Sequence, residues 1–396
     1  MRKICVVTGY RSDYTKLKSV IDSIGRSPDL ELQILVFGAH LLKDYGASIN
    51  NVETAGHPIS YKCTTAMEGD SPLAMVKTIG VSIIELSSAY SQLEPDIVIL
   101  VGDRYEILAA AIAASIGNIP VAHIQGGEVS GTIDETIRHT VTKLSHIHFP
   151  STELSKERIL MMGEYPDHVF NVGCPAVDYI KNVEYVDRDK INKLPGLSRL
   201  RIDFQKPYLV LIQHPVTTEH EQASKQMELT LEALQDIGVQ TVLIYPNPDA
   251  GSGEMVRAIR KHSRKHGKKG IVCNAYKNIS FDSYLNLLKN SSCLVGNSSS
   301  GIREAHLFGT PVVNIGTRQA SRERTDNIVD VGYEYDAIKN ATLSALHDNN
   351  CFKDNNIYGN GHAAEQIADI LADINIDNIF QKMSFRKKLE EGENVS

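Results

Sequence analysis

Residues 96–125 read DIVILVGDRYEILAAAIAASIGNIPVAHIQ and contain two apolar runs separated by a helix-like segment. The runs DIVILVGD (96–103) and IPVAHIQ (119–125) are rich in β-branched residues, and they lack the polar alternation of a half-exposed strand. The segment between them, ILAAAIAASIG (107–117), has the length and composition of a buried helix. A strand, a helix and a strand in this order predict a parallel sheet with helices on both of its faces.

The same rhythm continues on both sides of this stretch. Before residue 176, further strand-like runs occupy residues 3–9, 31–38, 146–150 and 169–174, and a long helix is expected at 73–93. The pattern restarts after residue 206, with strand-like runs at 207–215, 241–248, 270–275, 293–299 and 310–316 and a last long helix at 361–374. The chain therefore carries two series of strands.

Residues 176–206 interrupt the rhythm because they are charged, contain Pro and Gly, and show weak periodicity. We expect a linker at 181–206, between a Rossmann-like domain at 1–180 and a second Rossmann-like domain at 207–375. A C-terminal helix at 376–396 is expected to complete the first domain. The predicted fold class is α/β, with two doubly wound domains facing a cleft. An eight-fold barrel is the competing architecture; the polar break and the count of more than eight strands argue against it.

Composition limits the classes of function. The 396 residues are enough for two domains, and the net charge of −7 implies no general affinity for nucleic acid or an anionic membrane. Several of the six cysteines lie in apolar runs and no CxxC motif occurs, which favours buried thiols in a reducing compartment over disulfides or zinc. We find no run of the roughly 20 apolar residues that a spanning helix needs and no signal peptide. We therefore expect a cytoplasmic protein.

Polar side chains follow the predicted strands, at the edge where ligands bind in open α/β sheets. In the first half these residues are Arg11, Asp103, Arg104, Gln125, Glu128, Asp134 and His139. In the second half they are His214, Ser298, Ser299, Glu304 and Arg318.

The segment GNSSSGIRE (296–304) is typical of a phosphate site, because backbone N–H groups at a helix start and nearby hydroxyls favour an anion. Glu304 falls about one turn into that helix, where its carboxylate can accept two ribose hydroxyls. An ordinary serine N-cap remains the alternative. The guanidinium groups of Arg11, Arg104 and Arg318 suit a diphosphate, and surface salt bridges are their alternative.

Asp103 and Asp134 are candidates for an acid–base set, because carboxylates in different environments can hold different pKa values. Asp134 also stands where a helix cap would stand. His214 is interpreted as a phosphate or sugar contact, with a buried core histidine as its alternative. His146 and His148 alternate along one strand, but no carboxylate or cysteine has a matching spacing, so we expect no metal.

Taken together, the motifs resemble those of the hydrolysing UDP-N-acetylglucosamine 2-epimerases of sialic acid biosynthesis, including the epimerase half of the animal bifunctional epimerase/ManNAc kinase. The resemblance covers almost the whole chain and is carried by RSDY (11–14), GAHLLKDYG (38–46), GDR (102–104), GGEVSGTID (126–134), IRH (137–139), QHPVTT (213–218), PNPDAGS (246–252), GNSSSGIRE (296–304), FGTPVVNIGTRQ (308–319) and IYGNG (357–361). It implies a GT-B type fold, conversion of UDP-GlcNAc and water to ManNAc and UDP through a 2-acetamidoglucal, no cofactor, and a homodimer or homotetramer.

The resemblance also implies roles for individual residues. Asp103 and Asp134 match catalytic carboxylates of the family, and His214 matches a histidine of the cleft. The expected substrate-binding residues are Arg11, Arg104, Glu128, His139, Ser298, Ser299, Glu304 and Arg318. In the basic helix at 257–269, Arg257 and Arg260 match regulatory arginines of the animal enzymes, which suggests feedback by CMP-sialic acid.

One position departs from the family pattern. The family has H-I-E-G-G-E where this chain has HIQGGE, so Gln125 occupies the place of a catalytic glutamate. Glutamine keeps the shape of glutamate but cannot accept the proton, and the chain is therefore hypothesised to bind UDP-GlcNAc while turning it over slowly, as a natural variant or a deliberate substitution. Glu128 could replace the missing base. The open alternatives are the same chemistry on UDP-2,4-diacetamido-2,4,6-trideoxyglucose, a non-catalytic nucleotide-sugar binder, and a retaining glycosyltransferase, which would need an acceptor.

If position 125 takes part in proton transfer, Gln125→Glu is expected to raise the rate of UDP release by about 10²–10⁴-fold, the usual contribution of general acid–base assistance. The measurement is a coupled assay for UDP on both proteins. A reversion that leaves the rate unchanged contradicts the hypothesis.

Overall fold

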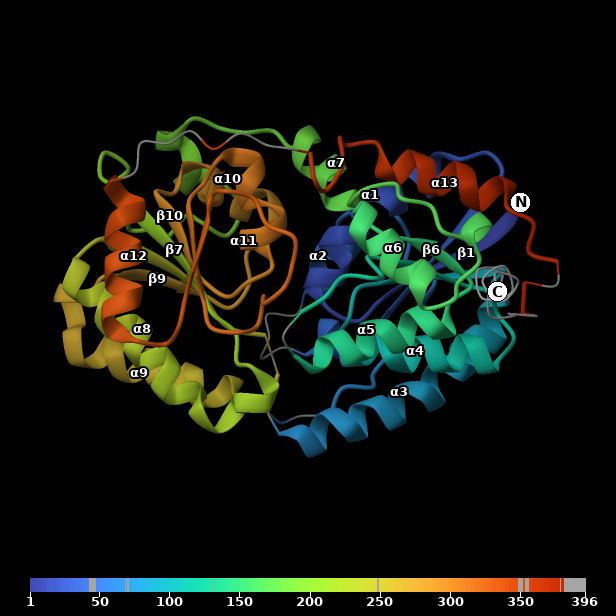
Figure 1. Cartoon of the computed structure of the whole chain (residues 1–396), viewed down its shortest axis with the longest axis horizontal. Coiled ribbons are helices and arrows are strands. Elements are labelled where there is room, and N and C mark those ends of the chain that lie inside the picture. Colours follow the sequence, from blue (N-terminus) through green and yellow to red (C-terminus); the bar gives the residue numbers. More distant parts are fainter. Residues whose placement is uncertain are drawn as a thin grey trace, which may run out of the picture.

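In the computed structural model, two α/β halves lie side by side (Figure 1). The structure describes residues 1–42, 48–67, 69, 71–130, 132–247, 249–347, 352, 356–377 and 379–380. Each half is built on one six-stranded sheet, in which all strand pairs are parallel. The prediction of two doubly wound domains is confirmed.

The first domain has the strand order β3-β2-β1-β4-β5-β6. Its strands are β1 (Arg2–Thr8), β2 (Leu30–Phe37), β3 (Tyr61–Cys63), β4 (Ile97–Val101), β5 (Val121–Ile124) and β6 (Ile147–Phe149). The helices are α1 (Arg11–Arg26), α2 (Ile49–Glu53), α3 (Pro72–Leu93), α4 (Tyr105–Ile116), α5 (Ile133–Leu144), α6 (Glu153–Met161) and α7 (Pro175–Asn182).

The second domain repeats this topology with the order β12-β11-β10-β7-β8-β9. Its strands are β7 (Tyr208–Ile212), β8 (Gln240–Ile244), β9 (Val272–Tyr276), β10 (Cys293–Gly296), β11 (Val312–Ile315) and β12 (Ile328–Val331). The helices are α8 (Ala223–Ile237), α9 (Ser252–His266), α10 (Phe281–Asn290), α11 (Ser300–Arg303) and α12 (Tyr335–His347). The last helix among the described residues is α13 (Ala363–Asp373).

The continuous apolar runs are explained by burial on both faces of each sheet. Along β1, Ile4 and Val6 belong to one hydrophobic core and Cys5 and Val7 to the other. Because successive side chains of a strand point to opposite faces, a strand covered on both sides has few positions for a polar residue. The second sheet likewise separates two cores.

The strand predictions fail at the edges of the sheets. Residues 169–174 are not a strand; they form one isolated bridge, between Val169 and His148. The short β3 and the half-exposed β12 were not predicted, because three residues are too few for a pattern and the sequence IVDV carries a polar residue. Edge strands pack on one neighbour only, and their composition is correspondingly less apolar.

The chain returns to the first domain at its end, by way of α13. This helix packs against α1 and α7, and its apolar residues Ile367 and Leu371 belong to a core of the first sheet. Figure 1 shows α13 on the side of the N-terminal half. The boundary expected at 375 is therefore wrong, because residues 363–373 bury their apolar face on the first domain. Most of the helix expected at 376–396 lies outside the described residues.

Helix α3 contradicts the expectation that no segment is long and apolar enough to cross a membrane. It has 22 residues and contains an 18-residue window with a mean hydropathy of 1.3, and it is the one such helix among the described residues. In the structure it packs against α4 of the first domain. Its buried side chains, which include Leu86 and Tyr90, form part of a hydrophobic core of that domain.

The strand order places the functional edge of each sheet. It reverses between β1 and β4 in the first sheet and between β7 and β10 in the second. At such a point the connections leave toward opposite faces, which opens a crevice at the carboxyl ends of the two strands. Arg11 and Asp103 follow β1 and β4, and His214 and Ser298 follow β7 and β10. The segments rich in predicted site residues thus lie at the two crevices.

Gly296 ends β10 at this reversal with φ +126, and a Cβ there would lie 2.0 Å from the backbone oxygen of Ile212 in β7. We expect Gly296→Ala to lower the free energy of unfolding by about 3 kcal/mol or more, through strain and a clash with backbone. Urea unfolding measures the loss. Gly238→Ala is the matched control: Gly238 has φ +76 but nothing within 4 Å of its Cβ position, so only about 1 kcal/mol is expected. Equal losses would contradict the steric argument.

Candidate active site

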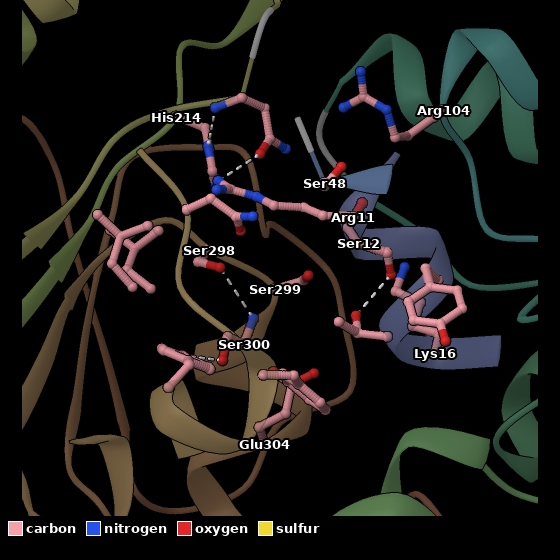
Figure 2. A pocket seen from close by; sticks show the side chains of 18 of the residues that line it. Arg11, Ser12, Lys16, Ser48, Arg104, His214, Ser298, Ser299, Ser300 and Glu304 are labelled. Atoms are coloured by element: carbon pink, nitrogen blue, oxygen red, sulfur yellow. Dashed lines mark hydrogen bonds between the residues drawn. The ribbon is translucent and has the colours of Figure 1, made fainter. Parts of the chain in front are cut away.

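A cavity of about 370 Å³ lies between the two domains, at the carboxyl-terminal edges of both sheets. Figure 2 shows Arg11, Ser12 and Lys16 of the first domain on one side, facing Ser298, Ser299 and Glu304 of the second. Of the residues expected to act on or bind substrate, those in the lining are Arg11, Asp103, Arg104, Asp134, His214, Ser298, Ser299, Glu304 and Arg318. The fold thus brings together in one cavity residues that were selected from strand ends up to 307 positions apart in the sequence.

The two arginines of the first domain reach across to the second. Arg11 donates hydrogen bonds to the backbone oxygens of Lys277, at 2.5 Å, and Tyr245, at 3.3 Å. Arg104 pairs with Asp249 at 3.1 Å and with Glu106 of its own domain at 2.9 Å. These contacts hold two cations at the cavity wall and join the domains there.

The serine-rich turn of the second domain follows β10 directly. Ser298 and Ser299 line the cavity, and α11 begins at Ser300. The backbone N–H of Ser300 donates to the Ser298 hydroxyl at 3.3 Å. The predicted helix start is confirmed, although α11 has only four residues before a 3₁₀ turn at Ala305–Phe308.

The two candidate carboxylates have opposite electrostatic surroundings. Burial would raise the pKa of Asp103, but Arg138, Lys16 and the other nearby cations hold it well below its usual range. Burial and the neighbouring charge of Asp103 raise the pKa of Asp134, against the opposing effect of Arg318, 3.7 Å away. Asp103 is therefore the carboxylate that stays ionised, and Asp134 the one that more readily holds a proton.

His214 is held as a neutral hydrogen-bond donor. Its Nδ1 accepts the backbone N–H of Asn247 at 3.0 Å, so in the neutral ring the proton is on Nε2. Burial and the charges of Arg318, Arg11 and Arg104 lower its pKa well below the usual value. Its backbone is fixed by two hydrogen bonds with the amide of Asn297, at 2.7 and 2.9 Å. Such a histidine can donate to a phosphate oxygen.

Glu304 is buried in the cavity wall, and its Oε2 has no hydrogen-bond partner within the part of the chain that the structure describes. Burial raises its pKa, which marks the ionised form as under-solvated. A buried acceptor without a donor is costly unless a ligand supplies one. The carboxylate is placed to accept hydroxyl groups, as a ribose would offer.

Three expected site residues are not in the cavity lining: Gln125, Glu128 and His139. The Gln125 side chain is fully buried with φ +65, and its amide donates to the Cys174 sulfur at 3.2 Å. Glu128 pairs with arginines of the second domain. His139 lies 3.9 Å from Glu135 on α5. The direction of these side chains depends on tertiary packing, which strand-end position does not predict.

The suggested effector residues lie on α9, outside the cavity lining. Arg257 is exposed and pairs with Glu254 one turn earlier, and Arg260 is exposed too. Sequence reasoning missed Lys16 and Asp249, which both line the cavity. Lys16 stands one helical turn after Ser12 at the start of α1, and this spacing after a strand end was the available signal.

The chain matches a family model described as UDP-N-acetylglucosamine 2-epimerase over residues 22–372. It belongs to this family. A UDP-N,N'-diacetylbacillosamine 2-epimerase (hydrolyzing) of Legionella pneumophila is 37% identical, covering 94% of this chain and 96% of the relative. A UDP-N-acetylglucosamine 2-epimerase of Neisseria meningitidis is 35% identical over 86% and 88%. The resemblance found in the motifs is confirmed, and the chain is a UDP-sugar 2-epimerase by family.

Solved epimerase structures confirm the GT-B type fold. The enzyme of Methanocaldococcus jannaschii, in complex with UDP-GlcNAc and UDP, superposes with a TM-score of 0.76 at 21% identity and covers 93% of this chain and 99% of that one. A solved structure of a UDP-GlcNAc 2-epimerase from Neisseria meningitidis bound to UDP-GlcNAc, at 19% identity, gives a TM-score of 0.74 with the same coverage. Among the described residues, no group of three or more His, Cys, Asp or Glu side chains is arranged to hold a metal ion.

We expect the His214 imidazole to remain neutral, with its proton on Nε2, between about pH 5 and 8, where an unperturbed histidine titrates. Burial and three nearby arginines disfavour its charged form. Nitrogen-15 NMR of labelled histidine measures the tautomer, and His214→Gln assigns the resonance. Titration of this resonance near pH 6.5 would contradict the electrostatic assignment.

Proposed function

We propose that this protein is a hydrolysing UDP-GlcNAc 2-epimerase that converts UDP-GlcNAc and water to ManNAc and UDP, for sialic acid biosynthesis. One observation carries the proposal: two carboxylates with oppositely shifted pKa values, Asp103 and Asp134, line a cavity whose other polar groups suit a nucleoside diphosphate. The family and the Neisseria relative support the reaction class.

The cations of the cavity have the right chemistry for the diphosphate. Arg11 and Arg318 approach from different domains, and guanidinium groups bind phosphate oxygens bidentately. The neutral His214 adds a donor, and Glu304 accepts the ribose hydroxyls. Binding at this place would put the sugar beside Asp103 and Asp134, because most of the side chains proposed to bind the nucleotide line the second-domain side of the same cavity.

In the proposed reaction Asp103 takes the proton from C2 of the sugar. The electron pair of the broken C2–H bond forms the C1–C2 double bond, and the C1–O bond to UDP breaks, giving 2-acetamidoglucal and UDP. Water then adds its oxygen to C1 while Asp134 protonates C2 on the opposite face. The proton lost by water restores Asp134, and the proton on Asp103 leaves to solvent with UDP. Enclosure between the domains limits the entry of water before the glucal forms.

The proposal is tested by NMR of UDP-GlcNAc incubated with the protein, in which resonances of the glucal and ManNAc are expected. Asp103→Asn and Asp134→Asn should each lower turnover by about 10²-fold or more, because each loses an acid–base group. Asp236→Asn, which removes an exposed carboxylate paired with Lys339 on the second domain, is the matched control and should keep the rate. Full turnover by Asp103→Asn would contradict the mechanism.

The two carboxylates are expected to limit the activity at opposite ends of the pH range. Asp103 must be ionised and its pKa is lowered, so activity falls only well toward acid pH. Asp134 must be protonated and its pKa is raised, so activity falls as the pH rises through that value. The same assay over a pH series is expected to show a bell-shaped rate, and loss of its alkaline limb in Asp134→Asn would assign that limb to Asp134.

A second candidate substrate is the diacetamido-trideoxy sugar nucleotide. It is favoured by the name of the Legionella relative, a UDP-N,N'-diacetylbacillosamine 2-epimerase that is 37% identical over nearly the full length of both chains. The chemistry at C1 and C2 is the same for both sugars. Incubating the protein with each sugar nucleotide separately, and comparing kcat/KM, discriminates the two substrates.

Three finer parts of the proposal rest on the motif resemblance. They are that Gln125 slows turnover, that CMP-sialic acid inhibits through Arg257 and Arg260, and that the protein is a homodimer or homotetramer; the proposed cytoplasmic location rests on composition instead. The Gln125→Glu comparison also addresses a purely binding role: a nucleotide-sugar binder would retain UDP affinity by calorimetry in both forms and release no ManNAc from either. Calorimetry with UDP and the turnover assay thus separate binding from catalysis.

A further inference from the structure

A buried cluster of charges joins the two domains beside the cavity. Arg322, in the segment after β11, lies 3.3 Å from the Asp103 carboxylate and 3.1 Å from that of Glu128. Arg303 at the end of α11 donates to the same Glu128 oxygen, Oε2. The arginines belong to the second domain and the carboxylates to the first, where they follow β4 and β5. Each of these ion pairs therefore crosses the interface between the domains.

The cluster is removed from solvent. The side chains of Arg303, Arg322 and Glu128 are 2%, 5% and 6% exposed. Burial is the main cause that lowers the pKa of Arg322 to about 10, and the charge of the nearby Arg303 is the next. The cations of the cluster are therefore crowded. A buried ion that loses its partners is strongly destabilising, so the cluster stabilises only the arrangement in which the domains meet.

Among the described carboxylates, Arg303 pairs with Glu128 only. Arg322 pairs with Glu128 and also with Asp103, the carboxylate proposed to react. Asp103 also forms an ion pair with Arg138 of α5. Arg138 belongs to the same domain as Asp103, so this pair does not depend on the position of the second domain. The contact with Arg322 exists only when the second domain is in place. Glu128 depends on the second domain still more, because its ion pairs with Arg303 and Arg322 both come from there.

We propose that Arg322 is a positioning residue, which couples closure of the two domains to the charge state of Asp103, while Glu128 holds it in place. The inference deepens the proposed function and rests on it for the role of Asp103. Closure buries Asp103, which by itself favours the protonated form, and the charge of Arg322, which arrives with the second domain, opposes this effect. When the domains close, the reacting carboxylate is ionised where water is excluded. Arg322 thus keeps the base ionised when the site is shut.

Charged and titratable groups from several elements lie around Asp103, and among them the strongest influences on its pKa come from Arg138, Lys16, Arg322 and Arg303. The surrounding groups are Lys16 of α1, His123 of β5, Glu128 of the following loop, Asp134 and Arg138 of α5, Arg303 of α11 and Arg322. Of these, Arg303 and Arg322 belong to the second domain, and Arg322 has the direct contact. Substitution of Arg322 isolates the inter-domain contribution.

The first test is the acid limb of the kcat against pH profile. Arg322→Gln is expected to move this limb to higher pH by about one unit, because an opposite charge at this distance lowers a carboxyl pKa by about that much or more. Arg322→Lys keeps a charge and should restore most of the limb. Arg324→Gln is the matched control, since Arg324 lies in the same segment and pairs with Asp330 of its own domain; its acid limb should stay where it is.

The second test needs no turnover. Small-angle X-ray scattering of the ligand-free proteins should show a larger radius of gyration for Arg322→Gln and Glu128→Gln than for the unchanged chain and Arg324→Gln. Chemical unfolding of each variant checks that both domains remain folded, and Glu128→Ala replaces Glu128→Gln if the latter fails to fold.

The outcomes separate the inference from the proposed function. If no sugar nucleotide is turned over, the proposed function fails and scattering alone decides whether Glu128 and Arg322 hold the domains together. If turnover occurs, a shifted acid limb without domain opening reduces Arg322 to a local charge and overturns the coupling. Domain opening without a shifted limb overturns it as well. Only the two changes together support the inference.

Discussion

The reversal of strand order, once in each sheet, is the constraint on which the rest of the molecule depends. Between β1 and β4, and between β7 and β10, the helical connections leave toward opposite faces. The carboxyl ends of these strands are therefore the one place on each sheet where backbone turns and polar side chains can stand free of a covering helix. Facing the two crevices toward each other creates the cavity, and the return of α13 to the first domain ties the halves together.

The interface between the domains collects charges that no single domain could keep buried. Asp103 and Glu128 of the first domain meet Arg303 and Arg322 of the second, and Arg104 meets Asp249 in the opposite direction. Since isolated buried charges are costly, the two halves are electrostatically incomplete when apart. The pKa values of the two cavity carboxylates are shifted in opposite directions. Nearby cations lower the pKa of Asp103, whereas burial and the neighbouring charge of Asp103 raise the pKa of Asp134.

Position 125 illustrates the distance between a motif and a site. The motif resemblance predicts a carboxylate of the family at the end of β5, and Gln125 stands there. With φ +65, however, its side chain donates to Cys174 at the start of α7, and Gln125 is absent from the cavity lining, which includes Asp103 and Asp134. The direction of this side chain depends on the backbone angle φ of Gln125 and on its contact with the start of α7, 50 residues later in the chain.

The sequence by itself determined most of the central strands, the long helices, the family, and the strand ends at which polar residues gather. These features follow from burial and from local periodicity, which are written in a few consecutive residues. Only the tertiary structure decided which strand-end residues share the cavity, that α13 belongs to the first domain, and that Arg138, Arg303 and Arg322 surround the carboxylates. Those outcomes depend on the order of strands in each sheet and on the approach of one domain to the other, and such long-range contacts leave no local pattern.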